Sequence, residues 1–192
     1  MSAPSDHRFP RCGETPGLAS AGLACDAVRV RSVLITGGNG GLGIAIAREF
    51  LDANPDDRVW LGVRTNRGEA ERVAVDHVGR CALLDLDVTR GEQWKAAVHT
   101  ILDDSGRLDV LVNNAGAHED HLLATMPEAV WNEVIRTNLA SVFLGCRTVV
   151  EPMMRQRHGR IINIASLSAL LPPIGQCNYA AAKAAVVPSG AR

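Results

Sequence analysis

A tyrosine and a lysine near the end of the chain have the spacing of a proton-transfer pair. Tyr179 and Lys183 lie at positions i and i+4 of the segment NYAAAKAAVV, so one face of a helix carries both side chains. An ammonium group held beneath a phenol favours the ionised phenol. The pair therefore predicts acid–base chemistry on a small polar group. A tyrosine at a helix start beside a solvated lysine is the alternative interpretation.

The segment TGGNGGLG, residues 36–43, predicts a site for the pyrophosphate of a dinucleotide. It follows an apolar run and precedes IAIAREFLD, in which Ile44, Ile46, Ala47 and Phe50 are the apolar positions of a helix. Glycines let the backbone turn tightly and approach phosphates, whose charge the free N–H groups of a helix start bind. The fixed places of the pattern T-G-x-x-x-G-x-G are held by Gly37, Gly41 and Gly43. A plain strand-to-helix turn is the alternative.

The elements that would position these residues alternate regularly. Five β-branched or leucine-rich runs, separated by amphipathic segments of helical length, cover residues 30–36, 57–63, 79–88, 107–114 and 159–166. Continuously apolar strands are typical of a parallel sheet buried on both faces. The sequence therefore predicts an α/β fold, a doubly wound (Rossmann) parallel sheet with helices on both faces and a ligand crevice at the carboxyl ends of the strands.

Together these motifs resemble the short-chain dehydrogenases/reductases. The resemblance covers about Val30 to Val187 and includes the glycine pattern, Asp87 in LDLDV, NNAG at residues 113–116, Asn138 in RTNLASVF, Ser166 in NIAS, and Y-x-x-x-K at Tyr179 and Lys183. Ser166 and Tyr179 are thirteen residues apart, which is the usual spacing in the family.

The resemblance implies a role for each catalytic residue. Tyr179 is expected to be the general acid in carbonyl reduction, and Lys183 to promote its ionisation and hold the nicotinamide ribose. Ser166 is expected to donate to the developing oxyanion; a capping role, with Ser168 as a possible partner, is the alternative. Asn138 falls in a helical stretch, residues 127–157, whose predicted apolar face includes Val130, Val134, Leu139, Val142 and Phe143. It is expected to anchor a water that relays protons from Lys183.

A second group of residues is expected to hold the cofactor. It comprises Thr36, Gly37, Asn39, Gly41, Leu42, Gly43, Arg64, Asp87, Asn113, Ala115 and Gly116, with Tyr179 and Lys183. Asp87 would contact the adenine; a turn or cap of a helix starting near Thr89 is its alternative. For Asn113, a purely structural tie between strands stays open.

The residues after the second strand favour NADP over NAD. An acidic residue there binds the ribose 2′-hydroxyl of NAD, whereas arginine suits a 2′-phosphate. The sequence reads GVRTNRGE, with Arg64 and Arg67 ahead of the first acid. The family's other common basic position is Gly40 here. NADPH usually drives reduction, so we expect a reductase.

Residues 117–126, AHEDHLLATM, resemble a loop beside the substrate entrance, with Leu123 and Met126 as lining or packing residues. His118 and His121 are three apart with no third ligand nearby, so we predict no metal site. Within the family the chain is most similar to 3-oxoacyl-acyl-carrier-protein reductases and polyketide ketoreductases. An acyl-carrier-bound or small ketone is the expected substrate, and a secondary-alcohol or sugar dehydrogenase is an alternative.

Composition supports a small-molecule partner. A net charge of −1 without a basic block predicts neither nucleic-acid nor membrane binding, and no run of about 18 apolar residues is present. Five cysteines without a C-x-x-C pair predict reduced thiols in a cytoplasmic protein.

The two ends of the chain carry expectations of their own. Residues 1–29 read as a flexible tail preceding one domain, residues 30–192. An export signal around Leu18–Ala24 with a lipidated Cys25, or a true start near Val28 or Val30, are alternatives for the tail.

After Val187, Pro188 breaks the helix, and SGAR follows. Family members continue through further strands and a substrate lid, so a C-terminally truncated or frameshifted, inert chain that at most binds nucleotide is the competing hypothesis. Family members also form homo-oligomers, which the cut pairing helix makes doubtful here.

Overall fold

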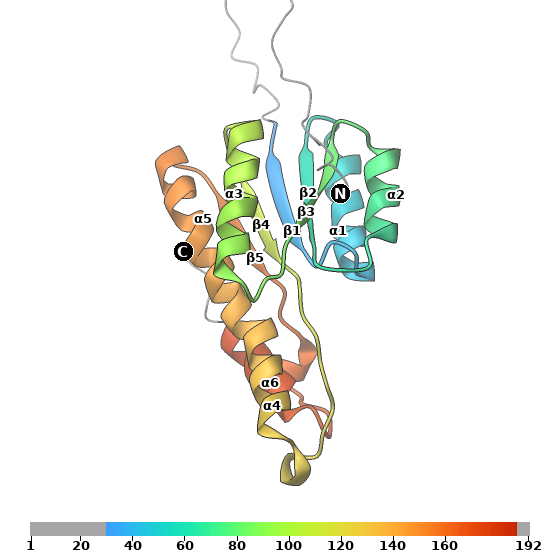
Figure 1. Cartoon of the computed structure of the whole chain (residues 1–192), viewed down its shortest axis with the longest axis vertical. Coiled ribbons are helices and arrows are strands. Elements are labelled where there is room, and N and C mark those ends of the chain that lie inside the picture. The colour runs from blue at the N-terminus through green and yellow to red at the C-terminus, as the bar shows by residue number, and fades with distance from the viewer. Residues whose placement is uncertain (1–29, 188–192) are drawn as a thin grey trace, which may run out of the picture.

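A computed structural model describes residues 30–187 of the chain (Figure 1). The predicted tail, residues 1–29, and residues 188–192 lie outside the described residues. The elements in chain order are β1 (Ser32–Thr36), α1 (Gly41–Ala53), β2 (Arg58–Val63), α2 (Gly68–Asp76), β3 (Cys81–Asp85), α3 (Gly91–Ser105), β4 (Val110–Asn113), the 3₁₀ turn η1 (Leu123–Thr125), α4 (Glu128–Ile135), the π-helical turn η2 (Arg136–Ala140), α5 (Ser141–Gln156), β5 (Arg160–Asn163), the 3₁₀ turn η3 (Leu167–Ala169) and α6 (Cys177–Val186).

The five strands form one parallel sheet in the order β3-β2-β1-β4-β5. All five predicted strands are confirmed, and each is shorter than the apolar run that predicted it. β1 and β4 are neighbours in the sheet although they are not consecutive strands of the chain, and the strand order reverses between them. Such a reversal opens a crevice at the carboxyl ends of the strands, because the connections on either side lead to opposite faces of the sheet. The doubly wound α/β fold is therefore confirmed.

Alternate residues of the strands bury two separate cores. Val33, Ile35 and Val112 face α1 and α2, whereas Leu34 and Leu111 face α3 and α5. Burial on both faces is the reason that the central strands are apolar at every position.

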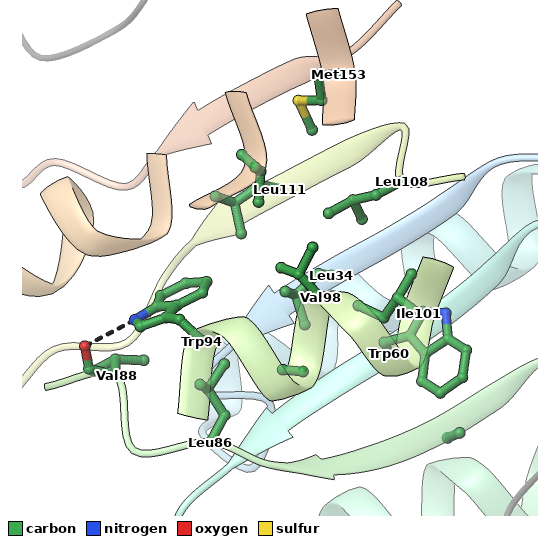
Figure 2. Packing of buried hydrophobic residues seen from close by; sticks show 13 residues of the cluster. Leu34, Trp60, Leu86, Val88, Trp94, Val98, Ile101, Leu108, Leu111 and Met153 are labelled. Atoms are coloured by element: carbon green, nitrogen blue, oxygen red, sulfur yellow. Dashed lines mark hydrogen bonds between the residues drawn. The ribbon is translucent and has the colours of Figure 1, made fainter. Parts of the chain in front are cut away.

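Trp94 of α3 organises the second core (Figure 2). Its ring is fully buried, and its indole N–H donates to the carbonyl of Val88 at 2.9 Å. A buried tryptophan needs such a partner for its one donor. The contact fixes the loop after β3, which carries Asp87, to the start of α3.

Two expectations about burial are wrong. β5 was expected to be buried, but it lies at the edge of the sheet, and Ile162 is 42% exposed. Phe143 was expected on the buried face of its helix, but it is 59% exposed. The π-helical turn just before it adds a residue to one turn and thus rotates the following side chains relative to a regular helix.

Three cysteines of the described residues are free thiols, namely Cys81, Cys146 and Cys177. Among residues 30–187, no helix is both long and apolar enough to cross a bilayer.

Candidate active site

The turn between β1 and α1 needs its glycines for two different reasons. Gly37 has φ +63°, and a Cβ there would lie 3.0 Å from the Cα of Ala115. A Cβ on Gly43 would lie 2.3 Å from the carbonyl oxygen of Gly37. Gly37 therefore provides a left-handed backbone and close approach to the loop after β4, whereas Gly43 allows α1 to pack tightly against the turn.

Gly41, by contrast, has no neighbour within 4 Å of a Cβ position. It is the first residue of α1, where backbone N–H groups have no partner within the helix. The space over the helix start is consequently open on the side from which an anion would approach. This arrangement fits the pyrophosphate of a dinucleotide, and Leu42 beside it is 55% exposed.

Thr36 joins the glycine turn to the NNAG segment. Its hydroxyl oxygen accepts the N–H groups of Asn114 and Ala115 at 3.0 and 2.9 Å. The side-chain amide of Asn114 in turn donates to the carbonyl of Thr36 at 2.8 Å. The two loops therefore move as one unit at the carboxyl ends of β1 and β4.

Asn113 takes a different place from its neighbour. It is buried, and its amide donates to Oδ1 of Asn163 at 2.9 Å and to the thiol of Cys146 at 3.6 Å. It does not line the pocket described below. The position favours the structural alternative for Asn113, a tie between β4 and β5, whereas Asn114, which was not singled out from the sequence, makes the contact with the glycine turn.

One pocket gathers six of the thirteen expected cofactor residues along the carboxyl ends of β1 to β4. Its lining consists of Gly37, Asn39, Gly62, Arg64, Thr65, Leu86, Asp87, Val88, Thr89, Ala115, Gly116, Ala117 and Thr137. The amide of Asn39 donates to the carbonyl of Thr65 at 3.0 Å, which joins the loops after β1 and β2 on one side of the pocket. Gly62, Thr65 and Thr137 were missed because only the folded sheet brings them to the same place.

Asp87 is an ionised acceptor at the edge of this pocket. Burial opposes its ionisation, but hydrogen bonds from Thr89 and the charges of Arg64 and Arg90 outweigh burial, so the pKa of Asp87 lies below its usual value. The side chain caps the turn at Thr89 with bonds of 2.7 and 3.0 Å. The capping alternative is thus present in the structure, although α3 itself begins later, at Gly91.

The two arginines expected to select the cofactor have different surroundings. Arg67 forms ion pairs with Asp85 and, at 3.6 Å, with Glu71. Arg64 is exposed, lines the pocket and forms no ion pair with any residue that the structure describes. An added anion would find Arg64 available and Arg67 already neutralised.

Tyr179 and Lys183, the predicted proton-transfer pair, lie together on α6. The Lys183 ammonium is 5.8 Å from the centre of the Tyr179 ring and donates to the carbonyl of Ile164 at 2.8 Å. Only 3% of Lys183 is exposed, and this burial lowers its pKa. Tyr179 itself is half-buried, so its phenol can meet a ligand from outside.

Asn138 is completely buried in the π-helical turn η2. Its amide donates to the carbonyls of Ala117 and Val134 at 2.6 and 2.9 Å. Its Oδ1 atom has no hydrogen-bond partner, and it is the one buried side-chain polar atom of residues 30–187 left in that condition. A Cβ added to Gly116 would lie 2.6 Å from this oxygen and 3.6 Å from the Lys183 nitrogen. The orphaned acceptor and the lysine therefore border the same glycine.

Ser166 follows β5 and begins the short turn η3. Its hydroxyl oxygen accepts the N–H of Ser168 at 3.2 Å, which is the expected cap. Accepting a bond leaves the hydroxyl proton free to donate elsewhere. The capping and catalytic interpretations are thus compatible.

His118 is exposed, as expected of a surface residue, and its ring also makes an edge contact with the ring of Tyr179, with centroids 5.9 Å apart. His121 contacts Glu119 at 3.2 Å instead. In the described part of the chain, no three potential metal ligands gather at one point.

Comparison with known proteins gives one family. The family model of the short chain dehydrogenases matches residues 31–188. A 3-oxoacyl-acyl-carrier-protein reductase of Chlamydia pneumoniae is 39% identical over 158 residues, which are 82% of this chain and 63% of the relative. Relatives with the same description from Vibrio harveyi and Escherichia coli K12 are 39% and 40% identical over 155 residues, which are 80% of this chain and 62% of each relative. The chain thus spans less than two thirds of the length of these relatives.

Proposed function

This chain belongs to the short-chain dehydrogenase family, and we propose that it reduces a ketone to a secondary alcohol with NADPH. The observation that carries the proposal is the meeting of three side chains at the carboxyl ends of the strands. Buried Lys183 lies against the ring of Tyr179, and the unpartnered oxygen of Asn138 borders the same glycine as the lysine. The pocket over the glycine turn opens beside them.

In the proposed reaction, Tyr179 donates the proton that the carbonyl oxygen gains. The bound nicotinamide supplies the hydride that the carbonyl carbon gains. Lys183 stabilises the phenolate that remains, because a cation close to a phenol favours its charged form. Ser166 keeps its hydroxyl proton directed at the substrate oxygen and stabilises the negative charge that develops there.

Asn138 is proposed to hold a water beside Lys183. Its Oδ1 atom is an acceptor without a partner, and such a buried atom is costly unless a water or ligand satisfies it. A water at this position would connect the lysine to the pocket and replace the proton that Tyr179 gives away. The small size of Gly116 leaves space there that a Cβ would fill.

NADP is the proposed cofactor because Arg64 is available for a 2′-phosphate. A guanidinium binds a phosphate through short, charge-assisted hydrogen bonds. Arg64 lines the pocket and forms no ion pair with a carboxylate of residues 30–187, although its charge acts on Asp87 and Glu133. NAD offers only a hydroxyl at this place, which would leave the arginine without a partner.

A 3-oxoacyl thioester is the proposed substrate class. The relatives named above are reductases of such compounds. Exposed apolar side chains near Ser166 and Tyr179 also suit an acyl chain, namely Leu167, Leu170, Leu171 and Ile174. We include in this proposal that the acyl group is bound to an acyl-carrier protein.

The test is to incubate the chain with NADPH and a short 3-oxoacyl thioester and to look for the 3-hydroxyacyl product by mass spectrometry. Formation of that product with NADPH, and much less with NADH, is the expected result. Oxidation of simple secondary alcohols or sugars without any 3-oxoacyl reduction would favour a dehydrogenase. A chain that binds NADPH and turns over none of these substrates would contradict the proposed activity.

A further inference from the structure

His118 touches the residue on which the proposed chemistry depends. Its imidazole packs edge-on against the ring of Tyr179, with centroids 5.9 Å apart and an interplanar angle of 64°. Lys183 approaches the same ring at 5.8 Å. The phenol therefore has two nitrogen-bearing neighbours, which come from different segments of the chain.

The backbone on both sides of His118 is held in place. Asn138 donates to the carbonyl of Ala117 at 2.6 Å, and Asn178 donates to the carbonyl of Glu119 at 3.0 Å. Both donating asparagines are completely buried, although the acceptor residues Ala117 and Glu119 are exposed. These bonds fix the backbone on either side of His118, and the exposed imidazole is placed by its contact with the Tyr179 ring.

The same loop is tied to the start of α6 a little further on. The N–H of His121 donates to the carbonyl of Gly175 at 2.9 Å, and the amide of Gln176 donates to Asp120 at 3.2 Å. Because α6 also carries Tyr179, the histidine and the tyrosine belong to one connected unit.

We propose that His118 is a positioning residue for Tyr179, whose imidazole holds the phenol ring in place and makes it sensitive to the charge of the histidine. The ring contact is a feature of the structure, whereas its consequence for turnover rests on the proposed function. An edge-to-face aromatic pair restricts the orientation of both rings. A charge at this distance also changes the field at the phenol.

Besides Lys183, His118 is the titratable group that a ring contact joins to Tyr179 among the described residues. The titratable or charged groups on neighbouring elements are Cys177, Tyr179 and Lys183 on α6, Glu128 and Glu133 on α4, Arg136 on η2, and Glu119, Asp120 and His121 on its own loop. Glu119 is engaged by His121, Asp120 by Gln176, and Glu133 by Arg136. η3, which packs on α6, carries no charge.

A spectroscopic test is available because Tyr179 is the only tyrosine of the chain. Tyrosine labelled with carbon-13 at Cζ then gives one NMR signal, which can be followed from about pH 5 to pH 8, where histidines ordinarily titrate. We expect the signal to move with pH in the wild type and in His121→Gln, and to lose this movement in His118→Gln. A signal that does not move in the wild type, or still moves in His118→Gln, would overturn the proposal.

Kinetics at about pH 8, where an ordinary histidine is neutral, test the ring contact separately. His118→Gln should lower kcat for the 3-oxoacyl thioester about threefold to tenfold, with KM for NADPH unchanged, and His118→Phe should restore most of it. Equal rates in His118→Gln and the wild type, or no rescue by phenylalanine, would refute the positioning role. Absence of turnover in the wild type would instead refute the proposed function, and the NMR titration would still decide whether His118 acts on Tyr179.

Discussion

Gly41 and Gly43 stand two residues apart on α1, yet an added methyl group would meet different surroundings at each. At Gly43 it would lie 2.3 Å from a backbone oxygen, whereas at Gly41 it would meet nothing within 4 Å. Gly43→Ala should therefore lower the free energy of unfolding by about 3 kcal/mol, because the helix and the turn must separate. Urea denaturation measures this loss.

Gly41→Ala is the matched variant with the opposite expectation. Its stability should equal or slightly exceed that of the wild type, because alanine has the better helix propensity. Its Kd for NADPH should rise about tenfold, since the methyl group stands where the pyrophosphate must approach. Calorimetric titration would contradict the assignment of this site if Gly41→Ala bound NADPH as tightly as the wild type.

The two arginines after β2 give a second prediction at the residue scale. Arg64→Gln should weaken NADPH binding about tenfold or more and leave NADH binding nearly unchanged, because it removes a charge-assisted bond to the 2′-phosphate. Arg67→Gln is the control, since Arg67 is already engaged by Asp85 and Glu71. A larger loss of NADPH affinity in Arg67→Gln than in Arg64→Gln would contradict this prediction, because it would show that Arg67 and not Arg64 binds the 2′-phosphate.

The packing of α5 against α3 and β4 depends on Gly145. A Cβ there would lie 2.6 Å from the ring of Trp94 and 2.7 Å from the side-chain oxygen of Asn113. Gly145→Ala should therefore destabilise the fold by about 2 kcal/mol, although alanine favours a helix. Gly91→Ala, whose nearest neighbour would be 3.8 Å away, should leave the melting temperature almost unchanged. Similar melting temperatures for the two variants would show that α5 does not need this close approach.

The residues predicted best from the sequence are those that strand topology alone positions. The glycine turn, Asp87 and Ser166 follow strands, and the carboxyl ends of parallel strands necessarily meet at one edge. The π-helical turn at Asn138 was not predicted; Asn138 donates there to Ala117, a contact distant in sequence that no local pattern indicates. The exposure of Phe143, which follows this turn, was missed for the same reason.

Contacts between side chains of different elements could not be predicted from the sequence either. Nothing in the segment GVRTNRGE distinguishes Arg64 from Arg67; Asp85, which neutralises Arg67, comes from a neighbouring strand. Likewise, the pairing of His118 with Tyr179 needs the loop and α6 to be brought together by Asn178 and Gln176. Such contacts follow from the tertiary structure rather than from local pattern.

At the scale of the whole molecule, Asp109 ties the amino ends of the central strands together. It is fully buried, accepts the N–H of Ser32 at 2.9 Å, and is paired with Arg107. Burial opposes its ionisation, but the bonds from Arg107 and Ser32 and the charges of Arg107 and His158 outweigh it and lower the pKa of Asp109. The folded state therefore binds a proton at this group less readily than the unfolded state.

This difference predicts a loss of stability in acid. A carboxyl whose pKa is lowered by folding contributes stability above its unfolded pKa of about 3.9, and the contribution disappears as pH falls through the lower folded value. Asp109→Asn should cost about 3 kcal/mol at pH 7, and the difference from the wild type should shrink below about pH 4. The control is Asp103→Asn, an exposed partner of His99, which should change stability by less than about 1 kcal/mol. Equal urea midpoints for the wild type and Asp109→Asn at pH 7 would refute this account.

The most direct test of the central claim is the rate of NADPH oxidation driven by a 3-oxoacyl thioester, compared between the wild type and Tyr179→Phe. Both proteins should be folded and bind NADPH, and Tyr179→Phe should lose at least about 100-fold in kcat, which is the usual contribution of a general acid. Equal rates would remove Tyr179 from the chemistry. A wild type that binds NADPH but oxidises none of it would contradict carbonyl reduction by this chain and leave nucleotide binding as its activity.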